Sequence, residues 1–502
     1  MKKIVFFFEM HQPRRIKRNF SITSFEEMNY FDDELNKEIF QRISKKCYIP
    51  TLEIFLENSK KYDFKFSLGI SGIFIEQCSW WEPKILELIK ELVDIGACEL
   101  VSETYYHSLA SLISEEEFKT QINLQRKILN EIFGVKTIVV ENTEFIYNNE
   151  IAKIMEELGF KIALTEGTEK VLDWRSPNYL YKAKNANLIL LMRNYRLSDD
   201  IGFRFTCKDW ICWPLTAEKY ANWLKMTPGE VIFIAMDFET FGEHHWPESG
   251  IHDFIKALPK YIKDNGLEIA KPSEVYSDLS PIDEINVENT ISWADSERDL
   301  SAWIGNEMQK YCFEIIKYME PMVKASSKEY LKIWRYFTTS DYFHYMSMKG
   351  GGEGAVHSYF SHFNSPIEAF IIFTSILSDF RYKVYQSMGK KLIYYKILFG
   401  SLPDSHAFHF YSGFAKPLGI KARNLIELYN AINKIDEEVI IFHIKRGDLS
   451  RWISEILGYR ELAEKLKKIN EKEIKEKVLK IIENEIKKIK NLLYGEEEIE
   501  KI

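Results

Sequence analysis

The stretch 233-FIAMDFETFGEHHWPESG-250 decides the fold class that we predict for this chain. An apolar run from Val231 to Met236 leads directly into a segment of acidic, histidine and tryptophan side chains that begins at Asp237. A strand that is apolar on both faces is typical of a covered parallel sheet. In parallel barrels the residues just past the carboxyl ends of the strands form the functional site. The stretch therefore predicts a strand that ends at an active-site edge.

Six further apolar runs precede this one and alternate with longer amphipathic segments such as 83-PKILELIKELVDIG-96 and 148-NNEIAKIMEELG-159. This alternation is the signature of a parallel α/β sheet or barrel. Seven strands over about 280 residues favour the barrel. The six other strands are expected at Lys3–Glu9, Phe64–Ile70, Cys98–Ser102, Thr137–Glu141, Lys161–Thr165 and Leu188–Met192.

The 502 residues exceed one ordinary core, so the chain is expected to form several domains. We predict a catalytic barrel over residues 1–280, a helical domain over 281–399 that contributes to the active site, and a small C-terminal α+β module over 400–502. In the module, 438-EVIIFHIKRGD-448 is expected to be a strand and turn. An apolar stripe within 471–489 predicts an amphipathic helix for packing or for self-association into a homo-oligomer.

Composition excludes several classes of function. The net charge of −8 and the absence of basic clusters argue against nucleic-acid binding. The apolar run at the N-terminus stops at Glu9, and no run approaches the roughly 20 apolar residues of a membrane span. Six scattered cysteines agree with a reducing compartment. We therefore expect a cytoplasmic protein without membrane partners, and abundant Lys, Glu and Ile suggest a thermophilic source.

The ends of the predicted strands deliver polar side chains to one rim. Among them, Glu144 and Asp237 can form the pair of carboxyl groups that glycoside hydrolysis requires. Asp237 follows four apolar residues, so partial desolvation is expected to raise its pKa, as a proton donor requires. Glu144 must stay ionised to attack. Carboxylates, histidines and aromatic residues converging from distant strands indicate a site for a polyhydroxylated ligand.

Several ordered motifs resemble glycoside hydrolase family 57, in its α-amylase-like branch. They are 11-HQP-13, the Glu99 segment with 104-TYYHS-108, 142-NTE-144, the segment from Asp237 to Trp246, and 291-ISWADSERDLSAWIGN-306, with a weaker likeness over 331–380. Residues 401–467 resemble a small uncharacterised module attached to archaeal sugar enzymes, which assigns no chemistry.

This resemblance implies a retaining enzyme on an incomplete, TIM-like (β/α)7 barrel that acts on α-glucans without a metal or other cofactor. By motif position, Glu144 is expected to be the nucleophile and Asp237 the general acid/base. The expected sugar-contacting residues are His11, Glu99, His107, Glu239, His244, Trp246, Trp293 and Asp295. We predict an α-amylase-type hydrolase of α-1,4-glucosidic bonds, with 4-α-glucanotransferase as the alternative within the same chemistry.

Two positions depart from the family pattern. Glu141 stands where a basic residue is common, and it could raise the pKa of Glu144 by like-charge repulsion. His245 replaces a common amide residue. Two alternatives of other classes stay open. One is a metal enzyme with ligands among His11, His107, His244, His245 and Asp237, and the other is a non-catalytic glucan-binding protein.

Overall fold

The computed structural model of the protein describes residues 1–22, 28–349, 361–469 and 473–495. The chain forms two compact units. Unit 1 comprises Met1–Ile316 with Arg335–Leu377, and unit 2 comprises Lys317–Trp334 with Ser378–Ile502. The expected division at residues 280 and 399 stays a prediction.

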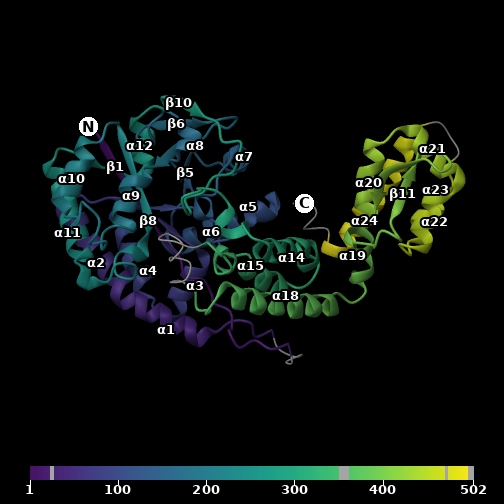
Figure 1. Ribbon diagram of the computed structural model, residues 1–502, viewed down its shortest axis with the longest axis horizontal. Helices are drawn as coiled ribbons and strands as arrows, with labels where there is room; N and C mark the ends of the chain where they lie inside the picture. Colours follow the sequence, from purple (N-terminus) through teal and green to yellow (C-terminus); the bar gives the residue numbers. More distant parts are fainter. Residues whose placement is uncertain (23–27, 350–360, 470–472, 496–502) are drawn as a thin grey trace. The chain divides into compact units, whose positions relative to one another are not determined.

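Unit 1 contains a nearly closed barrel of seven parallel strands (Figure 1). Around the barrel each strand pairs in parallel with its two neighbours, in the order β1, β2, β3, β4, β5, β7, β8 and back to β1. Two of these pairings rest on a single residue pair each. Ser102 pairs with Val140 between β3 and β4, and Arg193 pairs with Phe233 between β7 and β8. The strands are β1 (Lys3–Met10), β2 (Phe66–Ile70), β3 (Cys98–Val101), β4 (Val139–Val140), β5 (Ile162–Glu166), β7 (Ile189–Arg193) and β8 (Val231–Asp237).

These seven strands confirm the predicted fold class. The sequence analysis did not foresee three short strands outside the ring, β6 (Leu180–Ala183), β9 (Glu268–Ile269) and β10 (Asp283–Ile285). The expected strand 137–141 is regular over only two residues.

The pleat of β1 explains how its apolar residues, 4–8, contribute to two separate hydrophobic cores. Val5 and Phe7 belong to the core inside the barrel, whereas Phe6 and Phe8 belong to the core between barrel and helices. Side chains alternate along a strand, so Glu9 falls on the inward side at the end of β1. Helices cover the outside of the barrel (Figure 1). They include α1 (Asp33–Ile43), α2 (Ile49–Tyr62), α3 (Gly72–Trp81), α4 (Lys84–Asp94), α6 (Glu115–Phe133), α7 (Asn149–Glu157), α10 (Ala217–Met226), α11 (Ile251–Asp264) and α12 (Pro272–Asp278).

Helices dominate the chain after the barrel, as the sequence predicts for 299–399. They are α13 (Ser301–Ile304), α14 (Glu307–Lys324), α15 (Lys328–Phe337), α16 (Ser340–His344), α18 (Pro366–Met388) and α19 (Lys391–Phe399). Short α16 belongs to unit 1 and supplies residues to the site described below.

Unit 2 also contains an antiparallel hairpin of β11 (Phe408–Tyr411) and β12 (Pro417–Ala422). The prediction of a strand at 438–448 is wrong, because Glu437–Arg446 forms helix α21. Acidic residues in its first turn, basic residues in its last turn and left-handed Gly447 at its end all favour the helix. The remaining helices are α20 (Leu425–Lys434), α22 (Asp448–Glu455), α23 (Arg460–Lys467) and α24 (Ile474–Tyr494).

The amphipathic helix expected near the C-terminus is α24, which begins at Ile474. Residues 471–472 of the expected segment lie outside the described residues. Val478, Ile482 and Ile489 on its stripe are fully buried, and α24 packs against α19, α20, α21 and α23. The stripe therefore packs within unit 2, and self-association stays a prediction.

Within the described ranges, no helix has the length and apolar character that crossing a membrane would demand. The cytoplasmic location stays a prediction from the sequence.

Candidate active site

Charged residues occupy the last inward position of five barrel strands. They are Glu9 on β1, Glu141 just after β4, Glu166 on β5, Arg193 on β7 and Asp237 on β8. Each follows by two residues an apolar side chain of the inner core, so the pleat directs it into the barrel. The apolar interior is thus closed at its carboxyl-terminal end by a layer of ionisable groups.

Glu144 lies above this layer in the short 3-10 helix Thr143–Phe145, with a left-handed backbone (φ 61°). Three donors surround its carboxyl group. Trp293 donates its indole N–H to Oε2 over 2.7 Å, Ser340 donates to Oε1 over 2.9 Å, and Nε2 of His107 lies 3.5 Å from Oε1. A carboxyl group held by three donors is stabilised in its ionised form.

The pKa of Glu144 is accordingly lowered. Burial by itself raises it, but the hydrogen bond and charge of His107 and the hydrogen bond of Trp293 lower the pKa below the usual value. That Glu141 adds like-charge repulsion to Glu144 stays a prediction, and the net shift of the Glu144 pKa is downward. Burial, followed by the charges of Glu9 and Glu103, raises the pKa of Glu141 well above its usual range and so favours the protonated form of Glu141.

Asp237 has the opposite ionisation. Burial, followed by the negative charges of Glu9 and Glu144, raises the pKa of Asp237 to about 8. The surroundings therefore move the pKa values of Glu144 and Asp237 in opposite directions. Their roles as nucleophile and proton donor stay predictions.

His107 connects Glu144 with two carboxyl groups below it. Its Nδ1 lies 3.0 Å from Oε1 of Glu9 and 3.1 Å from Oε2 of Glu103. Burial by itself lowers the pKa of His107, but the charge of Glu9 and hydrogen bonds with Glu103, Glu144 and Glu9 raise it well above the usual value. These contacts favour the imidazolium form of His107 beside the carboxylate of Glu144.

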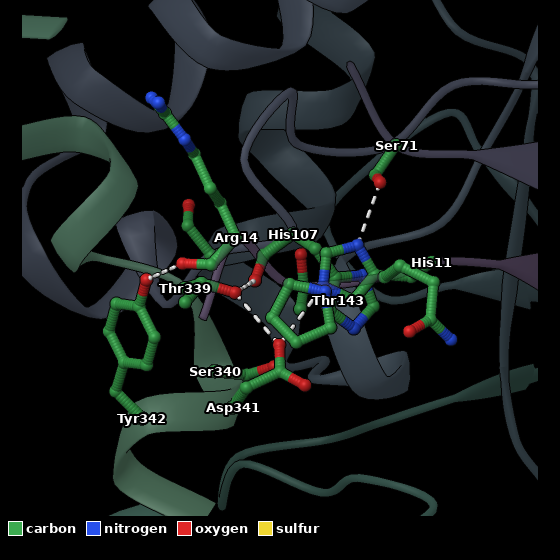
Figure 2. Close-up of polar contacts among 12 residues, drawn as sticks. His11, Arg14, Ser71, His107, Thr143, Thr339, Ser340, Asp341 and Tyr342 are labelled. Atoms are coloured by element: carbon green, nitrogen blue, oxygen red, sulfur yellow. Dashed lines mark hydrogen bonds and ion pairs between the residues drawn. The ribbon is translucent and has the colours of Figure 1, made fainter. Parts of the chain in front are cut away.

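His11 stacks on His107, with ring centroids 4.1 Å apart. Its Nδ1 lies 2.7 Å from Oγ of Ser71 and its Nε2 lies 3.0 Å from Oδ2 of Asp341 (Figure 2). Burial, followed by the charge of His107, lowers the pKa of His11 to about 4, so the ring is neutral. Because the Asp341 carboxylate can only accept, Nε2 of His11 carries the proton and Nδ1 accepts from Ser71.

Three predicted sugar contacts lie in the loop after β8. The carboxyl group of Glu239 is buried and accepts from the Tyr48 hydroxyl. Trp246 is 59% exposed, and the ammonium of Lys46 lies 4.6 Å from its ring centre. Burial lowers the pKa of His244 to about 3 and keeps that ring neutral.

Other predicted residues take different places. Glu99 lies outside the group around Glu144, and its Oε2 accepts the backbone N–H of Ser273 at the start of α12. Asp295 pairs with Lys349 over 2.8 Å. His245 hydrogen-bonds with the hydroxyl of Thr206 and the backbone carbonyl of Ile201.

Four residues of the site were not predicted from the sequence: Glu9, Glu103, Ser340 and Asp341. The alternation of side chains along β1 could have shown that Glu9 points into the barrel. The four-residue spacing between Glu103 and His107 could have indicated that these two side chains lie close together. Ser340 and Asp341 have no local signal, because a separate helix brings them to the barrel.

The ligand set proposed for a metal enzyme does not match the structure. His245 hydrogen-bonds with the hydroxyl of Thr206 and with the backbone carbonyl of Ile201. Within the described ranges, the His and carboxyl side chains close enough together to hold a metal ion are Glu9, Glu103 and His107.

The chain is similar in sequence to known proteins. The family model described as "Glycosyl hydrolase family 57" matches residues 5–288, which include the barrel except for the first two residues of β1. A Methanocaldococcus jannaschii protein named "Putative alpha-amylase" is 49% identical over 403 residues, covering 77% of this chain and 86% of that protein.

More distant relatives match less of the chain. An alpha-amylase of Pyrococcus horikoshii is 27% identical over 128 residues, which are 25% of this chain and 20% of that protein. The crystal structure of a branching enzyme from Thermococcus kodakaraensis superposes with a TM-score of 0.58 at 14% identity, covering 80% of this chain and 92% of that one. At this identity the superposition shows a shared fold.

Proposed function

Because the chain belongs to glycosyl hydrolase family 57, we propose that it is a retaining enzyme that cleaves α-1,4-glucosidic bonds in starch- or glycogen-type glucans and maltooligosaccharides. One observation carries the proposal. Glu144 is ionised while Asp237 bears a proton, because their surroundings move the two pKa values in opposite directions. Double displacement requires this pair of states before substrate binds.

In the first half-reaction, Asp237 donates its proton to the glycosidic oxygen while Glu144 attacks the anomeric carbon. The bond to the leaving sugar breaks, and a covalent glycosyl-enzyme forms on Glu144. In the second half-reaction, ionised Asp237 takes a proton from water, whose oxygen displaces Glu144 from the sugar. Both groups return to their starting states, and the anomeric configuration is retained.

The surrounding residues support distinct parts of this cycle. Trp293, Ser340 and His107 orient the carboxylate of Glu144 for attack. We assign sugar contacts to His11, Glu239, His244 and Trp246, which lie on the rim segments after β1 and β8. Contacts of Glu99 and Asp295 with sugar stay predictions, because their described partners are Ser273 and Lys349.

The test is a time course of the purified chain with maltoheptaose, in which products are resolved by size and new reducing ends are counted. Shorter products with rising reducing ends support hydrolysis. Longer and shorter products at a constant number of reducing ends would instead establish a 4-α-glucanotransferase.

The matched variant is Glu144→Gln, which keeps the shape and removes the nucleophile. We expect turnover to fall at least 10³-fold, in the range seen when an essential catalytic group is removed, while maltoheptaose still binds. Maltoheptaose binding without turnover in the unmutated protein would favour the glucan-binding alternative.

A further inference from the structure

We propose that Glu9, Glu103, Glu141 and His107 form a binding site for one divalent transition-metal cation, of the Mn²⁺ or Zn²⁺ class, directly beneath Glu144. The site lies inside the carboxyl-terminal end of the barrel. The binding proposal stands whether or not Glu144 is a nucleophile; only the positioning effect described below rests on the proposed function.

Three of the four donor groups are already gathered. One oxygen of Glu9, one oxygen of Glu103 and Nδ1 of His107 all lie within 4.8 Å of one another. Ligands bound at about 2.0–2.3 Å on opposite sides of one metal ion are about 4–4.6 Å apart. Small side-chain adjustments therefore suffice to place all three donors on one cation.

Glu141 provides an independent indication. Its side chain is fully buried, and neither carboxyl oxygen has a hydrogen-bond partner in the described part of the chain. Gly69 on β2 leaves the space that Glu141 fills, since a Cβ on Gly69 would lie 2.7 Å from Oε1 of Glu141. A buried polar group without a partner is energetically unfavourable, because it loses its hydrogen bonds to water and gains none in the protein. A cation bound also by Glu9 and Glu103 would supply the missing partner.

The orientation of His107 is that of a metal ligand. Its Nδ1 faces the two carboxyl groups, and its Nε2 lies 3.5 Å from the carboxylate of Glu144. Metal-binding histidines commonly coordinate through one ring nitrogen and donate the other N–H to a carboxylate. A cation would replace the proton on Nδ1 and leave Nε2–H directed at Glu144. It would hold the imidazole in place and take no step in bond cleavage.

The donor set defines the class of cation. Carboxylates suit Mn²⁺ and Mg²⁺, whereas imidazole suits Zn²⁺ and other transition metals. Three carboxyl groups and one imidazole thus favour Mn²⁺ or Zn²⁺ over Mg²⁺ or Ca²⁺, which prefer all-oxygen surroundings.

The experiment uses Mn²⁺ as the probe on the full chain. The protein is chelated, dialysed, loaded with Mn²⁺ and freed of excess metal, and bound manganese is then counted by mass spectrometry. We expect about one Mn²⁺ per chain, and at least 10-fold weaker binding in Glu141→Gln and Glu103→Gln. The matched control is Glu99→Gln, which changes a buried carboxyl group outside the cluster and is expected to bind Mn²⁺ like the unmutated protein.

A second measurement needs no variant and therefore does not depend on variant folding. Pulsed electron paramagnetic resonance of the loaded protein should show a coordinated imidazole nitrogen. Stoichiometry below 0.1, equal binding by all variants, or an all-oxygen spectrum would each overturn the proposal. Because binding is measured without substrate, these outcomes are distinct from a failure to cleave maltoheptaose.

Discussion

Trp293 donates its indole N–H to Oε2 of Glu144 over 2.7 Å, although the two residues are 149 positions apart in the sequence. Two backbone contacts fix this arrangement, because Trp293 also donates its backbone N–H to the carbonyl of Glu144 and Tyr147 pairs with Ile291. The segment after the barrel thus completes the surroundings of the carboxylate.

Replacing Trp293 with Phe removes this hydrogen bond and keeps an aromatic ring beside Phe145. A hydrogen bond to a charged group contributes about 1.5–3 kcal/mol, so we expect kcat/KM on maltoheptaose to fall roughly 10- to 100-fold. The acid limb of the pH profile should move to higher pH, because loss of a donor raises the pKa of Glu144. Trp174→Phe, at an exposed position, is the control. An unchanged acid limb would contradict this role of Trp293.

The alkaline limb of the pH profile is expected to report Asp237. Because its pKa is raised to about 8, Asp237 is protonated below this pH and loses the transferable proton above it. Cleavage of maltoheptaose by the chelated protein should therefore decline as the pH rises through about 8. The measurement is kcat/KM between pH 4 and 10, and a decline already complete at pH 6 would argue against Asp237 as the proton donor.

The same pKa shift predicts a conflict between activity and stability. Above the usual pKa of an aspartate, the unfolded chain releases the Asp237 proton while the folded chain keeps it up to about pH 8. The folded state then binds more protons, so this residue destabilises the fold increasingly as pH rises across that window. Asp237→Asn should abolish activity yet raise Tm at pH 8, with a smaller gain at pH 5. A gain that is independent of pH would refute this linkage.

Arg298 is expected to support the segment that carries Trp293. It donates to the backbone carbonyl of Trp293 and pairs with Asp199 over 3.1 Å, beside the buried pair of Arg193 and Glu166. Removing one partner from a buried ionic network costs about 3–5 kcal/mol.

Arg298→Met should therefore lower Tm by several degrees in thermal unfolding and also reduce kcat. Arg196→Met is the matched control, because Arg196 pairs with Glu169 at the surface, where the two side chains are 74% and 56% exposed. Exposed pairs contribute about 0–1 kcal/mol, so equal effects of the two substitutions would show that the Arg298 network does not stabilise the fold.

The barrel was predictable from the amino-acid sequence alone. Apolar runs separated by amphipathic helices specify parallel strands, and parallel strands bring their carboxyl ends to one rim. The sequence could therefore place Asp237, Glu144 and His107 at the same edge. It could also predict that Asp237 is desolvated, since the residues before it are apolar.

Only the tertiary structure decided which groups face Glu144 and which do not. Ser340 donates to Glu144 from helix α16, 196 positions away in the sequence. Glu99 lies on barrel strand β3 but accepts the backbone N–H of Ser273 instead. The segment 437–446 became a helix because a short apolar run fits both periodicities and its end residues favour the helix. Local patterns specify periodicity and burial, but the pKa of a buried carboxyl group depends on charges brought close by folding.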